Sequence, residues 1–228
     1  NLRLAIAKPG LFIETAGASS DPSPLTPRRS LKSAKASRII RALVDSRPPF
    51  RLTEIAARSF ADVGLVSRLL KQLEQEGLLS RKPRGAVTDV KWEELIRRWA
   101  QEYQVTKSNA PSYMLEPRGL PSLLTGLRAT TLRYALTGSV AASMRAAVAP
   151  AALAMLYVDD RGAVADELKL RPADSGGNVV LLVPKDSLPF EGATRQQDLV
   201  IAVPSQVAAD LLTGPGRNSS EAEVFLDW

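Results

Sequence analysis

Two helical patterns separated by a short break occupy residues 52–76. In the first, Leu52, Ile55 and Ala56 recur at the spacing of one helix face. The second pattern places an apolar stripe along one face, made of Val63, Val66, Leu69, Leu70 and Leu73. Asp62 is positioned to cap the second helix, and Gly77 can adopt the left-handed conformation that ends it. Two amphipathic helices joined this closely must pack on each other, which leaves the chain few possible motifs.

The residues that follow predict a β-hairpin. Residues 78–81 and 86–90 have strand character, and the turn between them is Lys82-Pro83-Arg84-Gly85. Two helices followed by such a hairpin form a winged helix-turn-helix, whose second helix enters the major groove of DNA. The outward face of that helix and the wing give the predicted DNA-binding residues: Ser67, Arg68, Lys71, Gln72, Gln75, Arg81, Lys82 and Arg84. We expect Arg68 and Gln72 to reach base edges and Ser67 and Lys71 to contact phosphates. The wing residues Arg81, Lys82 and Arg84 are expected along the DNA backbone or in a minor groove.

Positive charge is concentrated in the same part of the chain. The whole chain has a net charge of +6. Residues 28–107 carry 18 Lys and Arg against 9 Asp and Glu, a net of 18 − 9 = +9, whereas residues 108–228 carry 10 against 13, a net of 10 − 13 = −3. A basic surface beside a reading helix favours double-stranded DNA as the partner. A basic helix face that is merely solvated is the competing interpretation.

The composition excludes several classes of function. The chain has no cysteine and no histidine, and therefore no disulfide, thiol nucleophile or imidazole base. We accordingly expect no enzyme activity, no cofactor and no metal site. The longest apolar runs are too short to span a membrane, and the first residues lack the order of a signal peptide. These features predict a cytoplasmic protein without a membrane partner.

The charge break and the linkers predict the domain organisation. Residues 1–30 should form a β-hairpin, with strands over 2–7 and 11–16, and a Pro/Ser-rich linker. One interpretation of this segment is the remnant of a longer N-terminal domain. Residues 31–107 should form the winged helix-turn-helix with an appended helix, and residues 108–228 an α/β domain with a mixed sheet and a smaller net charge. The predicted fold class is α+β with two domains. The first helix of the DNA-binding domain is expected over 32–45.

An aromatic stripe marks the appended helix, expected over 91–104. Trp92, Trp99 and Tyr103 lie at helical spacing on it, and Asp89 is the expected cap. The stripe is either ordinary core or the contact of a homodimer, because regulators that read paired half-sites often associate through such a helix. Sequence leaves both interpretations open.

Residues 108–228 alternate between apolar runs of strand length and helical segments. Strands are expected over 131–136, 153–158, 178–183 and 199–203. Three prolines between residues 111 and 121 are expected to mark the domain junction, followed by a short helix over 119–127. A helix over 139–147 should start directly after a strand. Ser205 is expected to cap a helix over 206–212, and Ser220 with Glu223 a final helix.

Short motifs in this half carry a resemblance. They are Ala-Leu-Thr-Gly-Ser-Val-Ala-Ala at 135–142, Leu-Tyr-Val-Asp at 156–159, Asp-Leu-Leu-Thr-Gly-Pro-Gly-Arg at 210–217 and Glu-Ala-Glu at 221–223. With the winged helix they resemble the bacterial AbiEi-type antitoxins and transcriptional regulators, over roughly residues 30–228. The resemblance implies repression of the chain's own operon and a cognate toxin protein as partner. The first hairpin and Phe60, where such turns often carry glycine, depart from the pattern.

Gly138-Ser139 and the pair Asp159-Asp160 are similar to a nucleotidyltransferase site, in which a Gly-Ser turn holds triphosphate and carboxylates bind metal. Adjacent carboxylates on a strand point to opposite faces, which argues against an active enzyme. Three interpretations remain: a transferase, a degenerate nucleotide-binding relic, and a purely structural turn. Arg217 is a predicted partner contact, with an internal salt bridge as the alternative.

The predicted function is therefore a sequence-specific DNA-binding regulator, dimeric and autorepressing like an antitoxin. The alternative is a protein–protein interaction module in which the basic segment does not read DNA.

Overall fold

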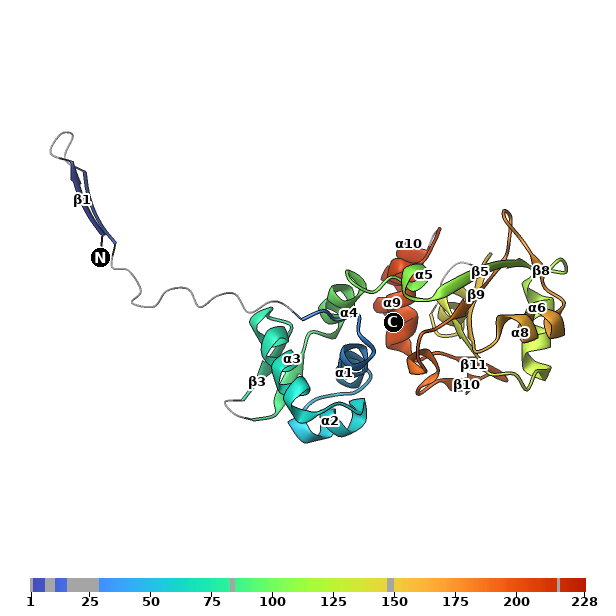
Figure 1. Cartoon of the computed structure of the whole chain (residues 1–228), viewed down its shortest axis with the longest axis horizontal. Helices are drawn as coiled ribbons and strands as arrows, with labels where there is room; N and C mark the ends of the chain where they lie inside the picture. Colours follow the sequence, from blue (N-terminus) through green and yellow to red (C-terminus); the bar gives the residue numbers. More distant parts are fainter. Residues whose placement is uncertain (1, 7–10, 16–28, 83–84, 147–149, 217) are drawn as a thin grey trace.

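The computed structural model describes residues 2–6, 11–15, 29–82, 85–146, 150–216 and 218–228, the first two ranges by their backbone alone. The backbone of β1 (Leu2–Ile6) pairs antiparallel with that of β2 (Leu11–Thr15), which confirms the predicted first hairpin. Its turn, most of the predicted linker and the predicted residues Arg84 and Arg217 lie outside the described ranges. The remaining elements form a helix-turn-helix half and a sheet half (Figure 1).

The helix-turn-helix half confirms the winged motif. Its elements are α1 (Ala34–Val44), α2 (Leu52–Ser59), α3 (Val63–Gln75), β3 (Leu79–Arg81), β4 (Val87–Val90) and α4 (Trp92–Ala100). The apolar faces of α1, α2 and α3 meet in one core, where Ile40, Ile55 and Leu73 are fully buried. Strands β3 and β4 pair antiparallel, with Leu79 opposite Val90. The periodicity gave these elements correctly because each buries an apolar stripe on its neighbour.

The turn between α2 and α3 takes its usual shape without glycine. Phe60 ends α2 with a φ of 49°, in the left-handed region that favours glycine, and its side chain is 82% exposed. Phe60 therefore adopts the left-handed backbone conformation that a glycine would adopt in such a turn, and this conformation is strained for a residue with a side chain. Asp62 follows and caps α3, since its Oδ1 accepts from the Leu65 backbone N–H at 2.7 Å.

The appended helix differs from the prediction. Asp89 lies in β4 and does not cap α4, whose first flanking residue, Lys91, makes no side-chain cap. The helix stops at Ala100, so Tyr103 is buried from the loop that follows rather than from the helix. Trp99 is buried, whereas Trp92 is 44% exposed. The aromatic spacing was real, but one end of the stripe faces outward.

The sheet half is a mixed sheet with helices on both faces. The strand order is β10-β11-β6-β7-β9-β5-β8. The β11–β6 and β7–β9 pairs are parallel, and the β10–β11, β6–β7, β5–β9 and β5–β8 pairs are antiparallel. The strands are β5 (Ala110–Leu115), β6 (Tyr134–Thr137), β7 (Ala154–Val158), β8 (Arg171–Pro172), β9 (Val179–Val183), β10 (Thr194–Gln196) and β11 (Leu199–Ile201). Three central strands, β6, β7 and β9, are almost wholly buried, which explains their continuous apolar sequence.

The helices of this half divide into two groups. They are α5 (Val105–Ser108), α6 (Leu120–Ala129), α7 (Gly138–Ser143), α8 (Arg161–Leu168), η1 (Leu188–Phe190), α9 (Pro204–Thr213) and α10 (Asn218–Leu226). One group, α7, α9 and α10, packs together and lies toward the helix-turn-helix half; α6 and α8 contact each other on the other side of the sheet (Figure 1). Helices α1 and α4 pack on α9, so α9 is the surface on which the two halves meet.

Three sequence expectations for this half are wrong. Residues 110–115 form β5 in the sheet instead of a proline-broken junction. Ser205 does not cap α9, because its hydroxyl hydrogen-bonds Asp45 Oδ2 at 2.8 Å. Helix α10 starts at Asn218, so Ser220 and Glu223 lie within the helix and not at its start, where they were expected. Glu223 instead accepts two hydrogen bonds from Arg97, at 2.6 and 2.8 Å, across the junction.

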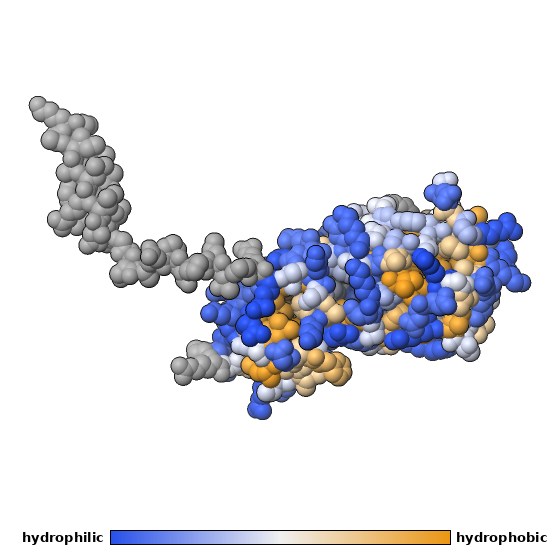
Figure 2. Space-filling view, in the orientation of Figure 1, coloured by the Kyte–Doolittle hydropathy of each residue, from blue (hydrophilic) through white to orange (hydrophobic). Residues whose placement is uncertain are grey.

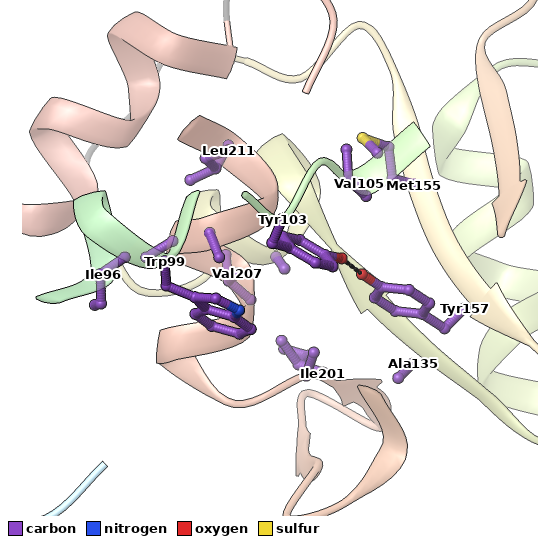
Figure 3. Close-up of a cluster of buried hydrophobic side chains, with 14 of the residues drawn as sticks. Ile96, Trp99, Tyr103, Val105, Ala135, Met155, Tyr157, Ile201, Val207 and Leu211 are labelled. Atoms are coloured by element: carbon purple, nitrogen blue, oxygen red, sulfur yellow. Dashed lines mark hydrogen bonds between the residues drawn. The ribbon is translucent and has the colours of Figure 1, made fainter. Parts of the chain in front are cut away.

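A buried carboxylate ties the two halves together. Asp210 on α9 is fully buried and accepts hydrogen bonds from Tyr103 at 2.7 Å, Tyr157 at 2.7 Å, Thr137 at 2.6 Å and Gln206 at 3.0 Å. Figure 3 shows Tyr103 and Tyr157 pointing at each other from opposite sides of this core. Burial raises the pKa of Asp210 to about 6, although these hydrogen bonds act to lower it.

Arginines from α1 add polar contacts between the halves. Arg38 forms a bidentate pair with Glu191, its Nη2 lying 2.6 Å from Oε1 and its Nε 2.9 Å from Oε2. Arg41 is buried and donates to the backbone carbonyls of Leu188 and Glu191. Burial lowers the pKa of Arg41 from its usual value. Guanidinium groups that bridge to carbonyls at this depth fix one half against the other.

Candidate nucleic-acid interface

The outward face of α3 carries the predicted reading residues. Gly64, Arg68, Lys71 and Gln75 are exposed and Ser67 is half-buried, opposite the buried stripe of Val66, Leu69, Leu70 and Leu73. Figure 2 shows the surface of the molecule in the orientation of Figure 1 as mainly hydrophilic, with scattered apolar patches. The helix therefore presents hydrogen-bonding and cationic side chains while its apolar side holds it to α1 and α2.

Arg68 folds back along the helix toward Gly64. A Cβ atom placed on Gly64 would lie 3.2 Å from Arg68 Nη1 and 3.3 Å from Asp62 Oδ1. Glycine at this position therefore leaves room for the guanidinium near the start of α3.

Arg68 and Lys71 form no hydrogen bond or ion pair with any other described residue. Most other arginines of the helix-turn-helix half do have such partners, for example Arg98 with Glu76 at 2.9 Å and Arg97 with Glu93 at 2.8 Å. Unpaired cations on an exposed helix face can exchange counterions for phosphates without first breaking an internal pair.

Gln72 is placed differently from the prediction. Its Oε1 accepts from the backbone N–H of Arg29 at 2.8 Å, and its Nε2 donates to the Arg29 carbonyl at 3.2 Å and to Glu76 Oε1 at 3.1 Å. The amide is thus used to hold the chain segment that precedes α1 against the reading helix. In this arrangement Gln72 has no capacity left for bidentate hydrogen bonding to an adenine.

The wing brings together only part of its predicted set. Arg81 pairs with Glu74 on α3, its Nε lying 3.0 Å from Oε2, and this hydrogen bond lowers the pKa of Glu74. Lys82 is exposed, and its backbone pairs with Ala86 and Gly85 at the turn, with no side-chain partner among the described residues. The register of the wing shifts between Ser80 and Arg81, so the pairing of β3 with β4 is irregular there.

Sequence reasoning missed Arg29 as part of this surface. The prediction places Arg29 in the linker, but its backbone is hydrogen-bonded to Gln72, so its exposed side chain lies beside α3. The signal was present, since Arg28 and Arg29 form a basic pair at the end of the linker. Basic segments flanking a reading helix commonly contact the neighbouring backbone or minor groove.

The side chains that resemble a nucleotide site all have partners within the chain. Gly138 has a φ of 62° and starts α7, while Ser139 donates to Asn218 Oδ1 at 2.9 Å. Asp160 caps α8 by accepting from the backbone of Gly162 and Ala163. Asp159 lies 3.5 Å from Arg133. No group of three or more acidic side chains within the described residues is placed to hold a metal ion.

No helix in the described part of the chain combines the length and the apolar character needed to cross a bilayer.

Comparison with known families agrees with this geometry. The model of the IclR helix-turn-helix domain matches residues 34–83. The model described as transcriptional regulator, AbiEi antitoxin, Type IV TA system matches residues 87–227. No curated protein and no solved structure matches the chain.

Fold and surface therefore define a helix-turn-helix DNA-binding regulator. The chain belongs to the family of AbiEi-type antitoxin transcriptional regulators of type IV toxin–antitoxin systems. Families of this kind are transcriptional regulators and antitoxins.

Proposed function

We propose that the chain reads its operator with Arg68 at base edges in the major groove, while Lys71, Ser67, Gln75 and Lys82 lie along phosphates. The observation that carries this proposal is the outward face of α3, where Arg68 and Lys71 are exposed and lack internal partners within the described residues. Arg is the commonest residue for bidentate recognition of guanine, and Lys pairs with phosphate as a point charge.

Two predicted residues take other roles in this proposal. Arg81 braces the wing against α3 through Glu74, and Gln72 holds the segment at Arg29. Arg29 replaces Gln72 as a contact, toward the DNA backbone. Arg84 and Arg217 stay predictions from the sequence alone.

The proposal also includes a homodimer on paired half-sites, autorepression, a cytoplasmic location, a cognate toxin as protein partner, and function without catalysis. The boundary between the two domains at residue 107 is also part of the proposal. The aromatic stripe has two interpretations, ordinary core and a homodimer contact. The burial of Leu95, Ile96 and Trp99 within one chain favours core. The exposed Trp92 remains available for a contact between copies.

A selection of bound duplexes from genomic fragments at near-physiological salt tests the proposal. It should return one motif, and two copies of it at a fixed helical spacing if the chain binds as a dimer. Arg68→Ala should then weaken binding to that motif by about 1–3 kcal/mol and relax one base position.

Arg171→Ala is the matched control, because Arg171 is an exposed arginine on β8 in the sheet half. It should leave binding unchanged. If Arg68→Ala loses the same affinity on random and selected duplexes, Arg68 does not read a base. Retention of a protein partner by a chain that shifts no DNA would favour the interaction-module alternative.

A further inference from the structure

Apolar side chains are exposed at the corner where α2 meets α3. Phe60 is 82% exposed, Val63 is 45% exposed, and the neighbouring Ala57 is exposed as well. We call these three residues the apolar corner. Figure 2 shows apolar surface at the lower edge of the helix-turn-helix half, where Figure 1 places α2. Single exposed apolar side chains are ordinary, but a group of them on one surface points to a contact with another molecule.

The core of the helix-turn-helix half does not use Phe60 or Val63. Ala61 and Leu65 pack against that core, whereas Phe60 and Val63 do not. Phe60 would be less strained as a glycine, because its φ is 49°. Val63 belongs to the apolar stripe of the sequence, but the structure buries Val66 fully and leaves Val63 exposed. A contact outside the chain therefore explains these side chains better than the fold does.

Val63 begins a row of side chains on the outward face of α3. Val63, Ser67 and Lys71 follow each other at four-residue spacing, so they lie one above another along the helix. Helical side chains tilt toward the N-terminus, and the methyl groups of Val63 therefore lie at the leading end of α3. In a helix-turn-helix, residues at this end of the second helix contact base edges in the major groove.

The charges around the apolar corner favour DNA as the molecule that covers it. Arg58 precedes the corner, and Arg68 and Lys71 follow it; all three are exposed, and none pairs with a carboxylate among the described residues. Arg58 donates to the Ser46 hydroxyl. The corner also carries Asp62, whose Oδ1 accepts from the α3 backbone at 2.7 Å as the helix cap. Cations on both sides of an apolar group suit a duplex, in which phosphates flank the base edges.

One base offers an apolar group in the major groove. Thymine carries a C5-methyl group there, which adenine, guanine and cytosine lack, and apolar side chains recognise thymine through it. We propose that Val63 packs against the C5-methyl group of a thymine, beside the base that Arg68 reads, and that Phe60 covers this contact from the side of α2. The inference rests on the proposed function, because it requires α3 to lie in the major groove. It adds a second base-specific residue to Arg68.

Replacing thymine by deoxyuridine removes this methyl group and nothing else, so it tests the proposal directly. The probe is the duplex returned by the selection described above, with each thymine replaced in turn. Binding of the full chain is measured by fluorescence anisotropy at one salt concentration. One thymine position should lower the affinity about fourfold when it is replaced, which corresponds to the burial of one methyl group. Val63→Ser should bind the thymine and deoxyuridine duplexes equally, and the thymine duplex about fourfold more weakly than the wild type does.

Val224→Ser is the matched control, because Val224 is also 45% exposed but lies on α10 in the sheet half. It should respond to the replacement like the wild type. Val63→Ala serves as a second variant if Val63→Ser does not fold, since alanine is the best helix former. Its response to the replacement should be smaller than that of the wild type.

The proposal is overturned if no thymine of the selected duplex responds to replacement, or if the response is unchanged in the Val63 variants. A selected motif without a fixed thymine overturns it too. Equal losses on both duplexes, together with a changed mass of the chain in sedimentation, would assign the apolar corner to a protein contact instead.

Arg68→Ala separates this failure from that of the proposed function. If Arg68→Ala relaxes one base position while no thymine responds, α3 reads DNA and only the role of Val63 is wrong. If Arg68→Ala lowers affinity evenly on every duplex and no thymine responds, the proposed function and this inference both fail.

Discussion

The cations on α3 and those at the junction of the two halves differ in how they are used. Arg68 and Lys71 are exposed and unpaired among the described residues, whereas Arg38 and Arg41 on α1 are held by Glu191, Asp45 and backbone carbonyls of the sheet half. Both sets belong to the same basic stretch of sequence. The cations of this stretch, whose net charge is +9, therefore form a paired and an unpaired population, and only the unpaired one is free to bind phosphate.

The junction shows what the paired population does. Its arginines, the Asp45–Ser205 hydrogen bond and the buried Asp210 network join α1 and α4 to α9. Removing one partner from such a network leaves a buried group uncompensated, which costs far more than removing an exposed charge. Substitutions at the junction should consequently change stability, and those on α3 and the wing should change DNA binding alone.

Asp210→Ala is expected to give the largest effect. It leaves Tyr103, Tyr157 and Thr137 without their buried acceptor, and we expect a loss of about 3–5 kcal/mol in the free energy of unfolding. Denaturant titration followed by circular dichroism measures it. A loss below about 1 kcal/mol would show that the network does not hold the halves together.

The same carboxyl should make stability depend on pH. Burial raises the pKa of Asp210 to about 6, above the value of about 3.9 expected in the unfolded chain. The folded state therefore binds more protons between these values, and stability falls as the pH rises from about 4 to about 6. A shift of about two units corresponds to about 3 kcal/mol.

Asp210→Asn is the reference for this measurement, because other carboxyls titrate in the same range. The hydrogen bond from Arg38, for example, lowers the pKa of Glu191 and acts in the opposite direction. The difference in unfolding free energy between wild type and variant should change over this window in favour of the variant as the pH rises. A difference that stays constant with pH would mean that Asp210 does not titrate in the folded state in this range.

Lys82→Ala on the wing should have a smaller effect, confined to DNA binding. We expect it to lower affinity evenly on all sequences and to reduce the slope of log K against log salt by about 1. Filter binding at several salt concentrations measures the slope. Thermal unfolding should be unchanged, since Lys82 is exposed and its side chain has no partner among the described residues. A change in sequence preference would assign Lys82 to base reading instead.

Arg97→Gln should have the smallest effect on the free energy of unfolding, and it tests how much an ion pair alone contributes to stability at the junction. Arg97 bonds Glu93 and, across the junction, Glu223, and these bonds raise the pKa of Arg97. The group is about one-third exposed, and solvent screening limits such a pair to about 0–1 kcal/mol. A loss above about 2 kcal/mol in chemical denaturation, more than an exposed pair can contribute, would place the junction's stability at its rim rather than at Asp210.

Local patterns in the sequence were sufficient for the reading motif. The apolar stripe of α3, the cap at Asp62, the glycine at Gly77 and the hairpin of the wing depend on residues a few positions apart, so periodicity predicts them. Caps in the sheet half failed where a distant partner competed, as when Asp45 took the hydroxyl of Ser205 from 160 positions away.

The sequence by itself determined the helix-turn-helix, its wing, the basic outward face and the mixed α/β character of the second half, because these follow from side-chain spacing and composition. Only the tertiary structure decided which cations are free. The contact of Gln72 with Arg29 spans 43 positions, and that of Arg38 with Glu191 spans 153. The use of the Gly138-Ser139 turn was decided in the same way, through Asn218. Such pairings arise when the chain buries its apolar faces, and no local spacing encodes them.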